Sequence, residues 1–135
     1  MHRIAFVRLR VLPLALVLPL LLVAGCGGGQ KTYSMAKTRA CLVAKKARVV
    51  PTPADDFVPN TAGGGTFRVR FPGNQVTLSF GDDRDEAQRI VRGYQKFAGK
   101  NIGLTDVLSA KRNTVILWAV HPKDSDLGVI EGCLK

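Results

Sequence analysis

Few side chains in this sequence could act as a general acid, a general base or a nucleophile. After residue 26 the one histidine is His121, directly before Pro122, and the loop carboxylates that could serve it are Asp55 and Asp56. Imidazole transfers protons near neutral pH, and a carboxylate can orient it, so this set would suit hydrolysis. An ordinary solvated or capping role is the preferred interpretation of these residues. We assign no catalytic residue and keep a small hydrolase using His121 as the alternative function.

Metal and cofactor sites need more ligands than the sequence groups together. Asp82, Asp83 and Asp85 supply fewer alternating oxygen ligands than a calcium loop requires, and they suit the start of a helix instead. The three glycines at 63–65 are not followed by the Lys and Ser/Thr of a phosphate-binding loop. We therefore expect neither a metal ion nor a cofactor.

The N-terminal residues have the pattern of a secretory signal peptide. Arg3, Arg8 and Arg10 precede a 14-residue apolar run from Val11 to Ala24, which contains two prolines. A membrane-spanning helix needs about 20 apolar residues, and proline disfavours it, so a cleaved signal is preferred over a permanent anchor.

The apolar run leads directly into Val23, Ala24, Gly25 and Cys26. This segment resembles the lipobox of bacterial lipoproteins, in which an aliphatic residue lies three positions before the cysteine and small residues follow it. The resemblance covers about the first fifth of the chain. It implies cleavage after Gly25, a diacylglyceryl group on Cys26 and acylation, for example by palmitate, of the new amino group. A single acyl chain gives only marginal membrane binding, so several chains together provide the anchor.

Export to an oxidising compartment also decides the expected state of the other cysteines. Once Cys26 carries lipid, Cys41 and Cys133 remain as an even number, and a disulfide between them is the expectation. This bond would join the start of the domain to its last turn. A reactive thiol served by His121 is the other interpretation, but nothing in the sequence lowers a thiol pKa.

Positive charge is the strongest remaining signal. The formal net charge is +10, or +7 after the first 25 residues, and residues 31–48 contain no acidic side chain. Anionic lipids or acidic polymers would attract such a segment, because each cation near an anionic surface contributes about 1 kcal/mol. Nucleic acid is not expected, because aromatic side chains are not interleaved with these charges. The predicted membrane or polyanion contacts are Lys31, Lys37, Arg39, Lys45, Lys46 and Arg48.

Residues 67–80 have the alternation of a β-hairpin. Apolar side chains from Phe67 to Phe71 and from Val76 to Phe80 alternate with polar ones, and Pro72 and Gly73 supply the turn. Both strands have the same parity, so the apolar side chains share one face. The other face is the predicted interaction face, made of Arg68, Arg70, Gln75 and Thr77.

The remaining elements complete an α+β pattern. Helices are predicted over about 35–47, with Ser34 as N-cap, over about 83–98, and from Pro122 to the C-terminus. A short strand is expected at 48–50, a long loop at 52–65, and a central strand in the doubly apolar run 115–120. We predict one small domain: an antiparallel or mixed sheet of three or four strands with two or three helices packed mainly on one face.

The expected organisation is a signal peptide at 1–25, a lipidated, glycine-rich flexible tether at 26–33 and a single domain at 34–135. The chain would be anchored through Cys26 in the cell membrane or the outer membrane, on the extracytoplasmic side. The main functional expectation is a non-catalytic binding or protein-interaction module of the cell envelope. Its partner would be an envelope protein or an anionic polymer.

Overall fold

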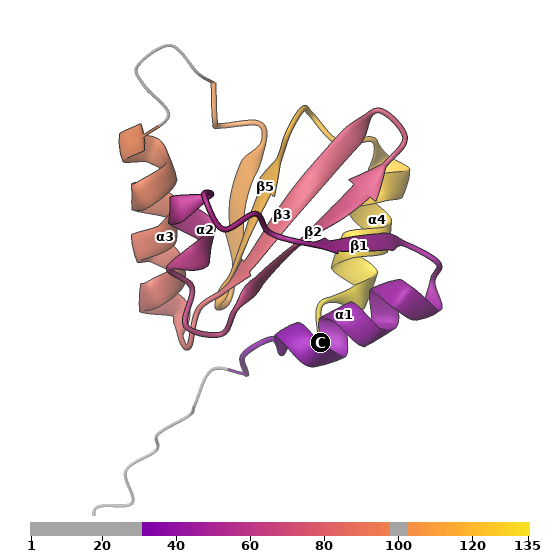
Figure 1. Cartoon of the computed structure of the whole chain (residues 1–135), viewed down its shortest axis with the longest axis horizontal. Coiled ribbons are helices and arrows are strands. Elements are labelled where there is room, and N and C mark those ends of the chain that lie inside the picture. Colours follow the sequence, from indigo (N-terminus) through magenta and orange to yellow (C-terminus); the bar gives the residue numbers. More distant parts are fainter. Residues whose placement is uncertain (1–30, 98–102) are drawn as a thin grey trace, which may run out of the picture.

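The computed structural model describes residues 31–97 and 103–135, so the predicted signal peptide and Cys26 lie outside the described residues. Within these ranges the chain forms four helices and one antiparallel five-stranded sheet in the order β1-β2-β3-β5-β4 (Figure 1). In chain order the elements are α1 Met35–Ala44, β1 Arg48–Pro51, α2 Phe57–Asn60, β2 Thr66–Phe71, β3 Asn74–Phe80, α3 Arg84–Phe97, β4 Leu108–Lys111, β5 Thr114–Trp118 and α4 Asp124–Cys133.

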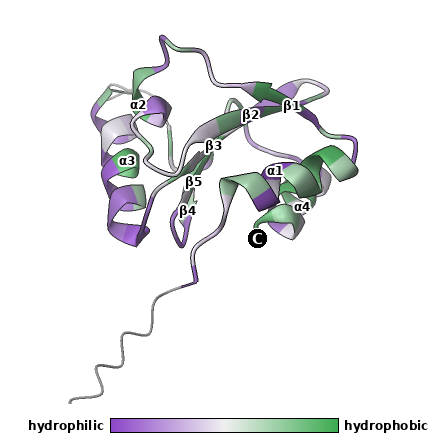
Figure 2. Cartoon of the chain, turned by 60° about the horizontal axis from the view of Figure 1, so that its bottom comes forward, coloured by the Kyte–Doolittle hydropathy of each residue, from purple (hydrophilic) through white to green (hydrophobic). Residues whose placement is uncertain are grey.

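Helices cover both faces of the sheet. On one face, Leu42 of α1 and Ile130 of α4 pack in a buried cluster with strand residues that include Leu78. On the other face, Ile90 of α3 packs in a second cluster with Val115 of β5. Figure 2 shows α1 and α4 together on one side of the sheet and α2 and α3 on the other. The sheet is thus the middle layer between two pairs of helices.

The predicted α+β domain with an antiparallel sheet is confirmed, but three details of the prediction are wrong. The sheet has five strands, because residues 108–111, for which no strand was predicted, pair with β5. There are four helices in the described ranges, because Phe57–Asn60 forms a short helix inside the expected long loop. The helices are not mainly on one face, because β5 is apolar on both sides and each side needs a cover.

The hairpin of β2 and β3 has the predicted parity. Phe67 lies opposite Leu78 and Val69 opposite Val76, and all four side chains are buried in the cluster beneath α1 and α4. Gly73 has φ +77 in the turn, a conformation that glycine adopts without steric cost. The alternating polar residues therefore face the side of α3.

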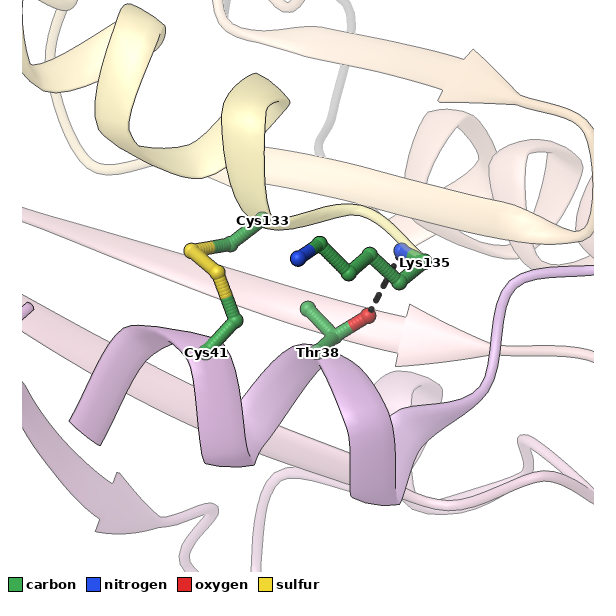
Figure 3. Close-up of a disulfide and its surroundings, with 4 residues drawn as sticks. All are labelled: Thr38, Cys41, Cys133 and Lys135. Atoms are coloured by element: carbon green, nitrogen blue, oxygen red, sulfur yellow. Dashed lines mark hydrogen bonds between the residues drawn. A yellow bond between two sulfur atoms is a disulfide. The ribbon is translucent and has the colours of Figure 1, made fainter. Parts of the chain in front are cut away.

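A disulfide joins α1 to α4, as predicted. The Sγ atoms of Cys41 and Cys133 are 2.06 Å apart, across a sequence separation of 92 residues. Beside it, the Lys135 N–H donates a hydrogen bond to Thr38 Oγ1 at 3.3 Å (Figure 3). The Ser34 N–H donates to the Lys135 carbonyl at 2.6 Å. In the chain-entropy model a bond closing a loop of this length stabilises a fold by about 4 to 5 kcal/mol.

A buried asparagine secures the point where the chain enters the domain. Asn113, which is 3% exposed, accepts a hydrogen bond from the Tyr33 N–H at 2.6 Å through its amide oxygen. Its amide nitrogen donates to the carbonyls of Tyr33 at 3.0 Å and Gly81 at 2.7 Å. The preceding turn residue, Arg112, has φ +53, and its guanidinium lies 4.7 Å from the centroid of the Tyr33 ring. One side chain therefore joins the N-terminal segment, the end of β3 and the β4–β5 turn.

All the described helices, strands, core clusters and the disulfide lie between residues 31 and 135. A domain that starts at Gly27 therefore contains all of the described packing contacts, and its free energy of unfolding can be measured.

We predict that Asn113→Ala lowers the free energy of unfolding by about 3 kcal/mol, because it leaves the buried carbonyl of Gly81 and the part-buried backbone groups of Tyr33 without partners. Urea unfolding followed by circular dichroism measures the loss. Asn60→Ala is the matched control, since the exposed Asn60 amide also donates to two carbonyls within 2.8 Å, those of Pro53 and Asp56. Water can replace those bonds, so its cost should stay below about 1 kcal/mol. Equal losses in the two variants would contradict the special role of Asn113.

Candidate functional site

The six basic residues predicted as a contact surface do not lie together. Four of them, Lys37, Arg39, Lys45 and Lys46, are exposed on α1 or directly after it. Lys31 instead lines a hollow of about 420 Å³ beside Asp82, Asp83 and Arg112. Arg48 belongs to β1, where it alternates with Val49, and Val49 packs on the cluster that contains α1. The side chain of Arg48 thus points to the opposite face of the sheet from α1.

The outward side of α1 combines cations with small apolar residues. Thr38 and Leu42 are buried against the domain, whereas Ala36, Ala40 and Val43 are exposed, Val43 by 56%. The helix contains no acidic residue, and none of its cations belongs to either ion pair of the described residues. A helix with apolar residues on both sides is normally packed against other structure on both sides.

The four residues of the predicted interaction face differ in exposure and in whether they already have a partner. Arg70 is exposed and Gln75 is half-buried, and the two lie opposite each other on β2 and β3. Thr77 is only 5% exposed, so it offers little surface. Arg68 forms an ion pair with Asp56, which directly precedes α2. Only Arg70 and Gln75 of the predicted set therefore remain open to a partner.

The strand register adds one residue that the sequence did not assign to this face. Arg48 of β1 lies directly opposite Arg70 of β2, and both are exposed. Like charges at directly opposed positions of an antiparallel pair are destabilising. The ion pairs of the described residues are Arg68–Asp56 and Lys111–Glu131, so neither Arg48 nor Arg70 is neutralised there.

A partly buried polar cluster lies beside this face, under α2. Asp55, Asp56 and Arg68 line an open hollow of about 360 Å³. Burial raises the pKa of Tyr94 to about 12, the Asp56 carboxylate adds to the rise, and Ser79 and Arg68 oppose it. The Tyr94 hydroxyl lies near Ser79 without a hydrogen bond of normal geometry, and Arg68 Nε is also buried without a partner. The phenol therefore stays protonated at neutral pH.

The acidic residues before α3 form a helix cap, as the sequence suggested. The Glu86 N–H donates to Asp83 Oδ1 at 2.7 Å. The Glu86 carboxylate in turn accepts from the N–H groups of Asp82 at 2.6 Å and Gly63 at 2.7 Å. Asp83 thus caps the first turn of α3, and the Glu86 carboxylate reaches back to the residue before the cap and ties the loop at Gly63 to the helix. In the described part of the chain no three His, Cys, Asp or Glu side chains are placed to hold a metal ion.

His121 is not brought into contact with the loop carboxylates. It is exposed in the segment between β5 and α4, and within residues 31–97 and 103–135 it forms no hydrogen bond or ion pair. The Asp56 carboxylate is engaged by Arg68 instead. No observation in the described ranges favours the hydrolase alternative over a binding module.

Comparison with protein-family models, with curated proteins and with solved structures gives no match. Among the residues that the structure describes, no helix has both the length and the apolar character needed to cross a bilayer. Sequence reasoning missed three juxtapositions in this region: Arg48 with Arg70, Arg68 with Asp56, and Tyr94 with Ser79. The first of these would have followed from the β1–β2 register, which no local pattern encodes.

We predict that Tyr94 makes stability fall at high pH. The unfolded phenol ionises near its ordinary pKa of 10.0, whereas the folded one stays protonated to about 12. Stability from this group is therefore complete below pH 10 and is lost as the pH rises toward 12, by about 1.4 kcal/mol at pH 11. Tyr94→Phe should remove this part of the decline and cost little at pH 8, because the hydroxyl lacks a hydrogen bond. Urea unfolding of both proteins at pH 8 and pH 11 tests it, and parallel declines would contradict it.

Proposed function

We propose that this chain is a lipid-anchored, non-catalytic binding module on the extracytoplasmic side of a bacterial membrane, held with α1 toward the anionic lipid surface. The observation that carries the proposal is the exposed, acid-free, cationic outer side of α1. This helix begins nine residues after Cys26, the expected lipid attachment point. The anchor and the cationic surface are therefore neighbours along the chain.

The charges of α1 are suited to this task by number and by accessibility. Lys37, Arg39, Lys45 and Lys46 are exposed, and none forms an ion pair within the described residues. Each cation near an anionic leaflet contributes about 1 kcal/mol, and the attraction fades within about 10 Å at 0.1 M salt. If residues 27–32 behave as a random coil, as their composition predicts, they would span roughly 14 Å and keep α1 close to that range.

The opposite face of the sheet is then directed away from the membrane. Arg48, Arg70 and Gln75 lie on this face, since they alternate with residues packed toward α1. A module held in this orientation would present these side chains to soluble or wall-bound partners. The exposed position of His121 and the engaged carboxylate of Asp56 support binding rather than acid–base catalysis.

We predict that the full chain, expressed in a bacterium that processes lipoproteins, incorporates labelled palmitate and that Cys26→Ser abolishes the labelling. The thioether needs the Cys26 sulfur, and amino-terminal acylation follows cleavage at that residue. Cys41→Ser is the matched control, because it removes a cysteine of the disulfide and should keep the label. Retention of palmitate in the Cys26→Ser chain, or its loss in both variants, would overturn lipid anchoring at this site.

We predict that the unlipidated domain from Gly27 floats with phosphatidylglycerol-containing vesicles at low salt, and not with phosphatidylcholine vesicles. A variant with glutamine at positions 37, 39, 45 and 46 should lose this binding. The control carries glutamine in place of four exposed cations of α3, Arg84, Arg89, Arg92 and Lys96, and should still float. Equal loss in both variants would indicate net charge alone and would contradict a contact through α1.

A further inference from the structure

We propose that Arg48 and Arg70, with Gln75 beside them, form a binding row for the phosphoryl groups of an extended polyanion. The proposal rests on the function above and names the chemistry of the partner that the exposed sheet face would meet. It concerns the face of the sheet opposite α1, so it is separate from the membrane contact.

The row is built by the strand register. Arg48 lies opposite Arg70 in the β1–β2 pair, and Arg70 lies opposite Gln75 in the β2–β3 pair. Directly opposed side chains have Cβ atoms about 5 Å apart, and neighbouring strands are about 4.8 Å apart. The three side chains therefore form a line of donors about 10 Å long across three strands. β1 is an edge strand, so this line begins at the open border of the sheet.

The charge of the row is not balanced by the described residues. Arg68, two positions before Arg70 on the same face, is neutralised by Asp56, whereas Arg48 and Arg70 have no such partner. Two opposed guanidinium groups repel each other in the free protein. A bound anion would remove this repulsion and gain charge-assisted hydrogen bonds to both groups. The arrangement therefore favours a ligand that two arginines contact at once.

The donor geometry favours phosphoryl over carboxylate groups. One guanidinium fork matches the two oxygens of a carboxylate, which lie in one plane. Each phosphoryl unit of a chain has two non-bridging and two bridging oxygens in a tetrahedral arrangement, so its acceptors face in more than one direction and can meet guanidinium groups from two strands. Gln75 adds an uncharged amide donor at the end of the row, where a further acceptor on the same ligand could bind.

The surroundings favour an extended ligand over a small enclosed one. Arg48 and Arg70 are exposed on the strand surface, and the nearby hollow is lined by the Arg68–Asp56 ion pair and by Asp55, whose negative charge disfavours an anion there. A polyanion lying along the row, away from these carboxylates, would meet both arginines and then Gln75. A chain of repeated phosphoryl groups matches such an open line of donors.

The test is titration of the domain from Gly27 with fluorescently labelled sodium polyphosphate at low ionic strength, after circular dichroism confirms that each variant is folded. Arg48→Gln/Arg70→Gln should weaken binding about 10- to 100-fold. The matched control, Arg89→Gln/Arg92→Gln on α3, removes the same charge from exposed positions and should change the affinity less than about threefold. Equal weakening by the two double variants would overturn the proposal.

Three further measurements distinguish an extended phosphoryl ligand from other ligands of this row. Poly-glutamate of matched length should bind more weakly than polyphosphate, and tighter binding would indicate an acidic protein segment and overturn the proposal. Inorganic phosphate should compete poorly, and affinity equal to that of the polymer would exclude an extended ligand. The Arg48→Gln/Arg70→Gln domain should still float with anionic vesicles, because α1 makes that contact. Loss of flotation would make the row a lipid headgroup site, whereas failure of flotation in every variant would count against the proposed function alone.

Discussion

The buried side-chain amide of Asn113 is the contact on which the arrangement of this domain depends. It bonds to the segment that enters the domain at Tyr33 and to the end of β3 at Gly81, and it lies in the turn between β4 and β5. An amide at this depth is stable only when its donors and acceptor are satisfied, and here three bonds satisfy them. Asn113 therefore determines where the N-terminal segment enters the domain, and it also connects the end of β3 to the β4–β5 turn.

On the face of the sheet covered by α1 and α4, the disulfide fixes the two helices to each other. Ser34 bonds to the carbonyl of Lys135, and about two helical turns later Cys41 is covalently joined to Cys133. Helix α1 is thus held at two points to the C-terminal end of α4 and the residues that follow it. With its inner side packed by Thr38 and Leu42, the helix must expose Ala40 and Val43 on its outer side. Because these contacts fix the orientation of α1, its remaining apolar side chains stay exposed to solvent.

The alternation of side chains along β2 and β3 gives the sheet one apolar face and one polar face. From Phe67 to Phe71 and from Val76 to Phe80, every residue that points toward α1 is apolar, and the residues between them carry arginine, threonine and serine side chains. Helix α3 covers only the half of the second face that includes β5 and β4. The uncovered half, over β1 and β2, is where Arg48 and Arg70 meet. The proposed membrane contact on α1 and the proposed binding row on β1–β3 therefore share no residues.

Local sequence by itself determined the elements whose signals are short-range: the Ser34 cap, the alternation of the β2–β3 hairpin and the acidic cap of α3. The pairing of Cys41 with Cys133 followed from the cysteine count, given an exported chain. Tertiary structure alone decided that Leu108–Lys111 is a strand, because an alternation only four residues long does not by itself predict a strand and the segment gains strand geometry by pairing with β5. It also decided that Arg48 faces Arg70 and that Asp56 neutralises Arg68, since register and loop folding join residues 22 and 12 positions apart. Such contacts depend on the packing of the whole sheet, and no periodicity along the chain records them.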